Sequence, residues 1–352
     1  MRDTLGRAAL TLALGVGAIA GCADAAPELP STLEAVAFDT LFEIGAASGA
    51  PHEVFQGVWD VELDGGGRMA LLDLGGPAVH IYDAEGVHLA SLDALGLEEG
   101  EMDDPTGIAW RAPGELAVWD PGSSWISTFR AAGSTVDFEA RHRAFAFGET
   151  GFCVAGDRDY LSYYGFQDGN VVHEIGPQGP VRSFGPAPDV VGVEVLGAEL
   201  REIAVEELTP SALLCTPAGV LDVGFVQSGI RLHDAEGSLQ WSRSFVDFRP
   251  VVAYSPDGIG LGRAFDEGQG SHLLRSVVSW GPSAVLVQHE LRRREIPDEG
   301  EVELLESRLI RLADGAEVDR TQEFPLVLAA EGRRLAVARA GAVPGVTVVE
   351  VR

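Results

Sequence analysis

The sequence predicts an all-β fold, a six-bladed β-propeller of four-stranded antiparallel blades, on three observations. Short runs of apolar and β-branched residues alternate with Gly, Pro and Asp turns, and 44 of the 352 residues are glycine. Helical periodicity is nearly absent, and only residues 193–207 carry a weak helical pattern. Related hairpins recur along the chain, which is typical of a repeat architecture.

The repeat is clearest in two hairpins that share the turn Asp-Ala-Glu-Gly. Residues 79–89 and 230–240 each consist of a strand, this turn and a second strand. Asp suits the first turn position, and Gly supplies the left-handed backbone conformation that closes the turn. Related hairpins are expected at 126–138, 163–175 and 309–324.

A two-strand element precedes each hairpin, and its second strand is an apolar run. We assign these second strands to residues 69–74, 115–120, 151–156, 220–226, 284–288 and 334–339. The result is six units with irregular spacing, which implies insertions at 176–207 and 248–274. Because residues 248–323 can be divided in more than one way, five or seven blades remain alternatives.

The last unit lacks one strand. Residues 324–352 supply about three strands and end in the β-rich segment 346–351, and the N-terminal segment 33–42 can supply the missing one. Closing the ring with strands from both termini removes exposed sheet edges. Each blade buries its faces against its neighbours, so no blade should fold alone. We therefore expect residues 33–352 to form a single propeller domain.

The N-terminus has the order of a secretory signal that ends in a cysteine. Arg2 and Arg7 precede an apolar run at 8–20, and small residues lead to Cys22. The run is short for a membrane span, which needs roughly 20 residues. This order resembles the bacterial lipoprotein signal, which implies a signal peptide at 1–21, a lipidated Cys22 and a tether at 22–32. A transmembrane anchor and secretion without lipid are the alternatives.

The residue after the cysteine bears on the destination of such a protein. It is Ala23 and not Asp, which by resemblance to enterobacterial lipoproteins favours the outer membrane over the inner one. We expect an exported protein of the cell envelope, either on the outer membrane or facing the periplasm, that contacts the membrane through its lipid anchor.

The charge balance excludes some partners. The formal net charge is −29, with 54 acidic and 25 basic residues and no lysine. A body this acidic repels phosphate backbones, so we expect no nucleic-acid partner. Anionic lipid surfaces should also repel it.

Two cysteines remain beside Cys22. Cys153 and Cys215 lie in apolar strand-like runs, and an exported context permits a disulfide between them. We nevertheless expect two buried free thiols that pack as small hydrophobic side chains. No CxxC pair or histidine cluster accompanies either cysteine, which argues against a metal site there.

Several segments resemble the NHL-like six-bladed propeller lipoproteins. Residues 42–45 read Phe-Glu-Ile-Gly, a form of the aromatic-x-Ile-Gly element of this family, and residues 100–105, Gly-Glu-Met-Asp-Asp-Pro, match its blade connector with Met for Phe. Residues 49–61, 182–186 and 286–288 also resemble this group. The resemblance implies a propeller fold and an envelope location. It carries over no catalytic residues, because the family has no common reaction.

No constellation in the sequence predicts a reaction or a cofactor. Asn170 lies in a turn pattern, and the eight histidines are scattered, with His80, His88 and His233 expected at solvated or edge positions. The acidic run at 98–104 lacks the spacing of a calcium loop and reads as a solvated connector. We therefore assign no metal ligands and no catalytic residues, and expect no cofactor.

One group of side chains suggests a binding surface. The aromatic residues crowd the first three blades, and we expect most of them in the core. Tyr160, Tyr163 and Tyr164 beside Arg158 are the expected exposed patch. The favoured function is a non-catalytic binding or scaffold module for a protein, peptide or glycan partner in the envelope. A propeller-type hydrolase or lyase, resembling the lactonases and with a metal site not evident in the sequence, is the alternative, so enzyme activity stays open.

Overall fold

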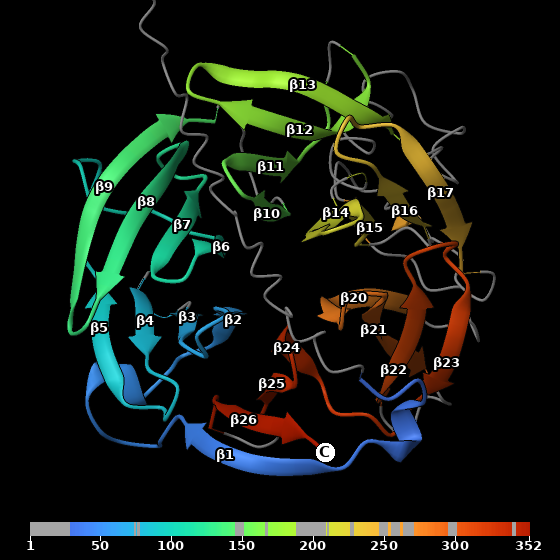
Figure 1. Ribbon diagram of the computed structural model, residues 1–352, viewed down its shortest axis with the longest axis horizontal. Coiled ribbons are helices and arrows are strands. Elements are labelled where there is room, and N and C mark those ends of the chain that lie inside the picture. The colour runs from blue at the N-terminus through green and yellow to red at the C-terminus, as the bar shows by residue number, and fades with distance from the viewer. Residues whose placement is uncertain are drawn as a thin grey trace, which may run out of the picture.

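The chain forms a ring of six four-stranded sheets, as predicted (Figure 1). The computed structural model describes residues 29–73, 75, 78–144, 151–165, 168–187, 209, 211–225, 229–245, 253–254, 261–262, 271–294, 301–339 and 343–352. The expected helical pattern at 193–207 lies outside these residues. No helix in the described ranges is long and apolar enough to cross a bilayer.

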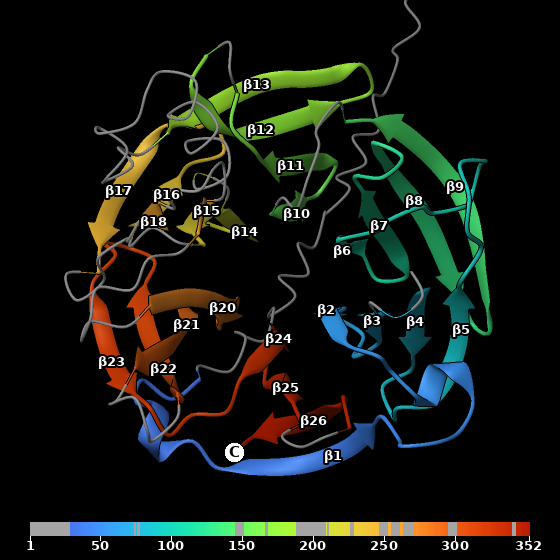
Figure 2. The same cartoon turned by 180° about the vertical axis from the view of Figure 1, so that it is seen from behind.

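Each blade is antiparallel, and its strands follow one another from the centre of the ring to the rim (Figures 1 and 2). The last blade takes its rim strand from the N-terminal segment. The strands are, for blade 1, β2 (Val58–Leu63), β3 (Met69–Asp73), β4 (Ala78–Tyr82) and β5 (His88–Leu92); for blade 2, β6 (Gly107–Ala112), β7 (Glu115–Asp120), β8 (Trp125–Ala132) and β9 (Thr135–Arg143); for blade 3, β10 (Phe152–Ala155), β11 (Arg158–Ser162), β12 (Asn170–Gly176) and β13 (Gly179–Pro186); for blade 4, β14 (Ser211–Thr216), β15 (Gly219–Gly224), β16 (Gly229–His233) and β17 (Leu239–Ser244); for blade 5, β20 (Ser271–Trp280), β21 (Ala284–Arg294), β22 (Glu301–Arg311) and β23 (Glu317–Thr321); and for blade 6, β24 (Val327–Glu331), β25 (Arg334–Ala338), β26 (Val346–Val351) and β1 (Phe38–Ile44).

The predicted strand order is correct in five blades and wrong in blade 3. The run at 151–156 is the first strand, β10, and not the second, and the outer hairpin spans 170–186 instead of 163–175. The expected insertion at 176–207 therefore contains a regular rim strand, β13. The expected insertion at 248–274 contains a two-stranded sheet of β18 (Ala253–Tyr254) and β19 (Leu261–Gly262), and the start of β20.

The ring closes as predicted, because β1 pairs with the C-terminal strand β26. Before β1, a 3-10 helix η1 (Leu33–Ala35) leads the chain along blade 5. Leu29 and Pro30, within the segment expected as tether, contact blade 5.

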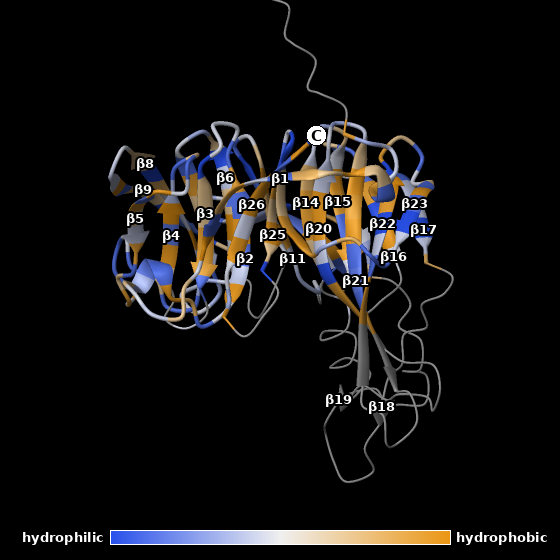
Figure 3. Cartoon of the chain, turned by 90° about the horizontal axis from the view of Figure 1, so that it is seen from below, coloured by the Kyte–Doolittle hydropathy of each residue, from blue (hydrophilic) through white to orange (hydrophobic). Residues whose placement is uncertain are grey.

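The two faces of the ring differ in which connections between strands lie on them (Figure 3). On the hairpin face, the first strand of each blade turns into the second, and the third turns into the rim strand. On the connector face, the second strand passes into the third and the chain crosses to the next blade. The C-terminus lies on the hairpin face (Figure 3).

Apolar packing occurs between blades and not at one central core. The buried hydrophobic residues form six clusters, one at each interface between neighbouring blades. Each sheet therefore buries both faces only when its neighbours are in place, as expected for a closed repeat architecture.

The two Asp-Ala-Glu-Gly turns are confirmed. Gly86 and Gly237 have φ values of +82° and +84°, which a residue with a side chain rarely adopts. Asp83 and Asp234 each use a side-chain oxygen to accept two backbone N–H bonds from the turn. These are the hydrogen bonds that make Asp favourable at this position.

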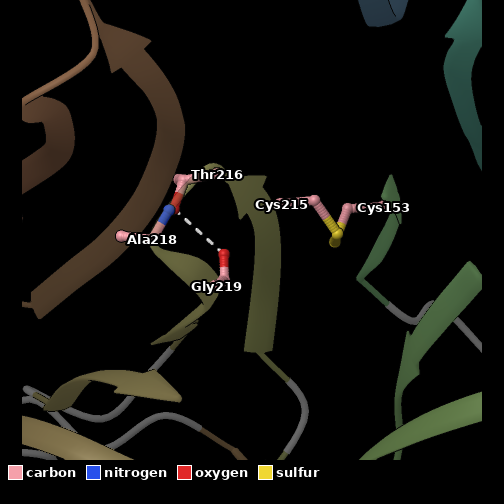
Figure 4. Close-up of a disulfide and its surroundings, with 5 residues drawn as sticks. All are labelled: Cys153, Cys215, Thr216, Ala218 and Gly219. Atoms are coloured by element: carbon pink, nitrogen blue, oxygen red, sulfur yellow. Dashed lines mark hydrogen bonds between the residues drawn. A yellow bond between two sulfur atoms is a disulfide. The ribbon is translucent and has the colours of Figure 1, made fainter. Parts of the chain in front are cut away.

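The expectation of free thiols is wrong. Cys153 in β10 and Cys215 in β14 form a disulfide, with Cα atoms 5.6 Å apart (Figure 4). The innermost strands of blades 3 and 4 run side by side, which brings together two residues 62 positions apart in sequence. Beside the disulfide, Thr216 Oγ1 donates a hydrogen bond to Gly219 O and closes the β14–β15 turn (Figure 4).

Candidate functional site

The structure divides the expected tyrosine patch. Tyr160 is only 2 % exposed and lies in the core between blades 3 and 4, where its ring contacts Phe184 edge-on, so its expected exposure is wrong. Arg158 starts β11 at the hairpin face, whereas Tyr163 and Tyr164 follow the end of that strand at the connector face. These residues do not form one surface. A binding role for the half-buried Tyr163 and Tyr164 stays a prediction.

The histidines expected at solvated positions are mostly buried. His80 and His233 are 3 % and 1 % exposed, and only His88 keeps partial exposure. His80 Nδ1 lies 2.8 Å from Ser91 Oγ, and His173 Nδ1 lies 2.9 Å from Ser183 Oγ. Both pairs bridge the third and fourth strands of a blade, so they support the sheet.

Buried carboxylates fix two segments of the connector face. Asp73 Oδ1 accepts hydrogen bonds from the backbone N–H groups of Gln56 and Gly57, just before β2. In blade 2, Asp120 accepts from the N–H groups of Asp103 and Asp104 at 2.8 and 2.9 Å, and from the Ser123 hydroxyl. Because each Asp ends the second strand of its blade, it ties the incoming connector to the sheet.

The connector between blades 1 and 2 displays two leucines. Leu95 and Leu97 are 61 % and 62 % exposed, while Met102 in the same loop is 1 % exposed. Backbone bonds from Gly96 N to Met102 O and from Met102 N to Ala94 O, both 2.9 Å, close the loop. The leucines are thus held outward by an ordered backbone, beside the carboxylates of the acidic run at 98–104.

Two tryptophans extend this surface. Trp59, at the connector-face end of β2, is 41 % exposed and donates its Nε1–H to Thr106 O. Arg141 donates a hydrogen bond to Leu97 O and lies 4.5 Å above the centre of the Trp125 ring. We call the exposed Trp59, Leu95 and Leu97 and the half-buried Trp125 the connector-face apolar surface. Exposed apolar side chains on a fixed backbone are typical of protein interaction sites.

The innermost strands also hold carboxylates with raised pKa values. Burial raises the pKa of Asp60 in β2 to about 6, although hydrogen bonds from Ile108 N–H and Val61 N–H oppose this. Burial and the neighbouring Asp60 raise the pKa of Glu62 well above its usual range. Burial also raises the pKa of Glu331 in the adjacent strand β24. Carboxyl groups with raised pKa values are a feature that binding and catalytic sites share.

The sequence did not single out these groups. Asp60 and Glu62 alternate with apolar residues as in any strand, and only the packing of β2 against β6 and β24 creates their environment. Among the described residues, no group of three or more His, Cys, Asp or Glu side chains has an arrangement that could hold a metal ion.

Among the comparisons with known proteins, only those with solved structures find similar proteins. No protein-family model and no curated protein sequence matches the chain. A crystal structure of a Bacteroides fragilis protein, described as a candidate exported protein, is similar with a TM-score of 0.57 and 9 % identity over 91 % of this chain and 96 % of that chain. The β-propeller domain of Myceliophteria thermophila Cps50 (Swd1) reaches a TM-score of 0.44 and 11 % identity over 88 % of this chain and 98 % of that chain.

By its fold, the protein belongs to the class of six-bladed β-propellers. Its blades are four-stranded and antiparallel, and strands from both ends of the described chain close the ring. At 9 % identity, the Bacteroides structure supports the fold alone.

Proposed function

We propose that this chain is a lipid-anchored envelope propeller of the NHL-like lipoprotein type, which uses its connector face to bind a protein or peptide partner without catalysis. The binding surface is the connector-face apolar surface, together with the acidic run beside it. A glycan partner would use the same face through its tryptophans.

Two independent observations support export. The N-terminal segment has the order of a lipoprotein signal ending at Cys22, and the body contains the Cys153–Cys215 disulfide. Disulfides persist in oxidising compartments such as the periplasm and are rare in the cytosol. The similarity to a Bacteroides protein described as a candidate exported protein agrees with this location.

The single observation that carries the binding function is the ordered display of Leu95 and Leu97. Their loop is closed by backbone hydrogen bonds and by the buried Met102, so little conformational entropy is lost when a partner covers them. The surrounding carboxylates favour a partner surface that is apolar and positively charged.

Photocrosslinking in cells tests this function. A photoreactive amino acid at Leu97 should give a discrete adduct with an envelope protein, and the same residue at the exposed Ser134 of the hairpin face should not. Leu95→Ser should weaken the adduct at position 97. Equal adduct patterns at both positions, or an adduct insensitive to Leu95→Ser, would contradict the proposed surface.

A hydrolase or lyase remains the second candidate because of Asp60 and Glu62. Two neighbouring carboxyl groups with raised pKa values are suited to general acid and base chemistry. Metal analysis of residues 23–352, purified without chelator, is the first test of the lactonase-like form of this candidate. A stoichiometric divalent ion would favour an enzyme, and Asp60→Asn should then lower hydrolysis across a panel of lactones and esters.

A further inference from the structure

We infer that the hairpin face lies against the lipid bilayer that carries the anchor, and that the connector face points away from the membrane. The inference rests on the proposed lipidation of Cys22. It adds an orientation, and so a membrane-contacting surface, to the proposed function.

The N-terminal segment is fixed to the hairpin face of blade 5. Trp280, at the hairpin-face end of β20, donates its Nε1–H to Pro30 O at 2.9 Å. Leu29 packs on the cluster between blades 5 and 6, where Leu33 is 2 % exposed. Leu33 N–H also donates to Asp319 Oδ2 at 2.6 Å. The chain is therefore attached to the propeller from Leu29 onward.

The remaining spacer is short. Leu29 follows Cys22 by seven positions. A fully extended chain covers at most roughly 3.3–3.6 Å per residue, so the lipidated cysteine lies within about 25 Å of the attachment point. In blade 5, to which the segment is attached, β20 has 10 residues and β21 has 11, which at roughly 3.3 Å per residue span more than about 30 Å. To turn the connector face toward the bilayer, the spacer would have to cover this thickness and the turns at both ends.

The hairpin face also carries exposed aliphatic side chains at its rim. Each lies at the hairpin-face end of the rim strand of a different blade, so together they mark the edge of the disc. These residues are Val87, Val181, Leu239 and Val318, which are 59 %, 64 %, 55 % and 42 % exposed. Aliphatic side chains at the interface favour contact with a lipid surface.

Both faces carry acidic residues, and on the hairpin face these include the exposed Glu85 and Glu236 of the Asp-Ala-Glu-Gly turns. Near the hairpin face, arginines pair with acids, as in Arg130 with Glu139 and Arg352 with Asp39. The connector face carries the acidic run at 98–104. An anionic bilayer repels acidic residues on either face, so the orientation rests on the short spacer and on the exposed aliphatic side chains.

Energy transfer from single labelled positions to acceptor-labelled lipids tests the orientation. The full lipidated chain is inserted into phosphatidylcholine vesicles that contain phosphatidylglycerol as the anionic lipid. Labels are placed at Ser134→Cys or Glu236→Cys on the hairpin face, and at Glu99→Cys or Asp104→Cys on the connector face. All four side chains are exposed. We expect transfer from both hairpin-face labels to exceed transfer from both connector-face labels several-fold.

Two further variants separate the possible failures. A Gly/Ser insertion of about twenty residues after Ala26 should remove most of the difference between faces, because such linkers are flexible and long. Cys22→Ser should abolish vesicle binding. If the wild-type chain itself does not bind vesicles, the proposed lipid anchor fails. If it binds and the labels transfer equally or in reverse order, the orientation is overturned.

Discussion

Phe184, in the rim strand of blade 3, lies against Gly237 in the hairpin turn of blade 4. A Cβ atom at position 237 would approach the Phe184 ring to 2.8 Å. Phe42 of blade 6 has the same relationship to Gly86 of blade 1, at 2.5 Å. In these two blade pairs, the aromatic residue of the rim strand therefore covers the glycine turn of the next blade, which links turn chemistry to the contact between blades.

This contact predicts that Gly237→Ala is more destabilising than a glycine substitution at an open turn. At Gly133, φ is +59° and a Cβ would meet nothing within 4 Å, so Gly133→Ala should cost only the backbone strain of roughly 1 kcal/mol. Gly237→Ala adds a collision with Phe184 and should cost roughly 1–3 kcal/mol more. Urea unfolding of both variants measures the difference. Equal losses would mean that the ring moves aside freely.

The disulfide should contribute strongly to stability. Replacing Cys153 and Cys215 together by Ala should lower the free energy of unfolding by about 2–4 kcal/mol, because the bond closes a 62-residue separation in the unfolded chain. Urea unfolding checks this value. Reductant should lower the stability of the wild type and leave the double variant unchanged; a reductant effect on both would point to another cause.

Asp120 should be needed to order the connector that displays Leu95 and Leu97. Asp120→Ala leaves the N–H groups of Asp103 and Asp104 without their acceptor and should cost about 1–3 kcal/mol. Asp120→Asn keeps one acceptor oxygen and should cost less. Hydrogen exchange of residues 94–104 provides the local readout. Unchanged protection in Asp120→Ala would show that the loop is held by its own backbone bonds alone.

Asp60 should make the protein less stable as pH rises from about 4 to 6. The pKa of Asp60 is about 6 in the folded protein against 3.8 ordinarily, so the folded state keeps a proton that the unfolded state releases in this window. The stability lost across the window is on the order of 2 kcal/mol. Urea unfolding from pH 4 to 7 should show a smaller loss in Asp60→Asn. The exposed Asp137→Asn is the control and should follow the wild type.

His80 should have the opposite effect on acid stability. Burial, and next the neighbouring His88, lower the pKa of His80 to about 4, while Asp73 and Asp93 oppose the shift and His52 adds to it. Between pH 6.5 and 4, His80 is therefore protonated in the unfolded chain but mostly neutral in the folded protein. The free energy of unfolding falls as pH drops through this range. His80→Asn should reduce this loss, measured by the same titration. An identical pH dependence in the variant would exclude His80 as its source.

The sequence by itself determined the repeat and its closure. The paired Asp-Ala-Glu-Gly turns, the alternation of apolar runs with turns, and the β-rich segments at both ends of the body were sufficient to predict six blades and a closed ring. These are local signals, since a turn residue or a strand pattern acts over a few neighbours. Blade 3 was misassigned because its first strand, Phe152–Ala155, is as apolar as the second strands elsewhere.

Only the tertiary structure decided which side chains share a surface or a core. Tyr160 faces the neighbouring blade while Arg158, two residues earlier, stays exposed at the hairpin face. The Cys153–Cys215 bond and the raised pKa of Asp60 depend on neighbouring innermost strands that lie far apart in sequence. Contacts between blades join residues about one repeat apart, and the pattern of a single strand does not show which side chain a neighbouring blade will cover.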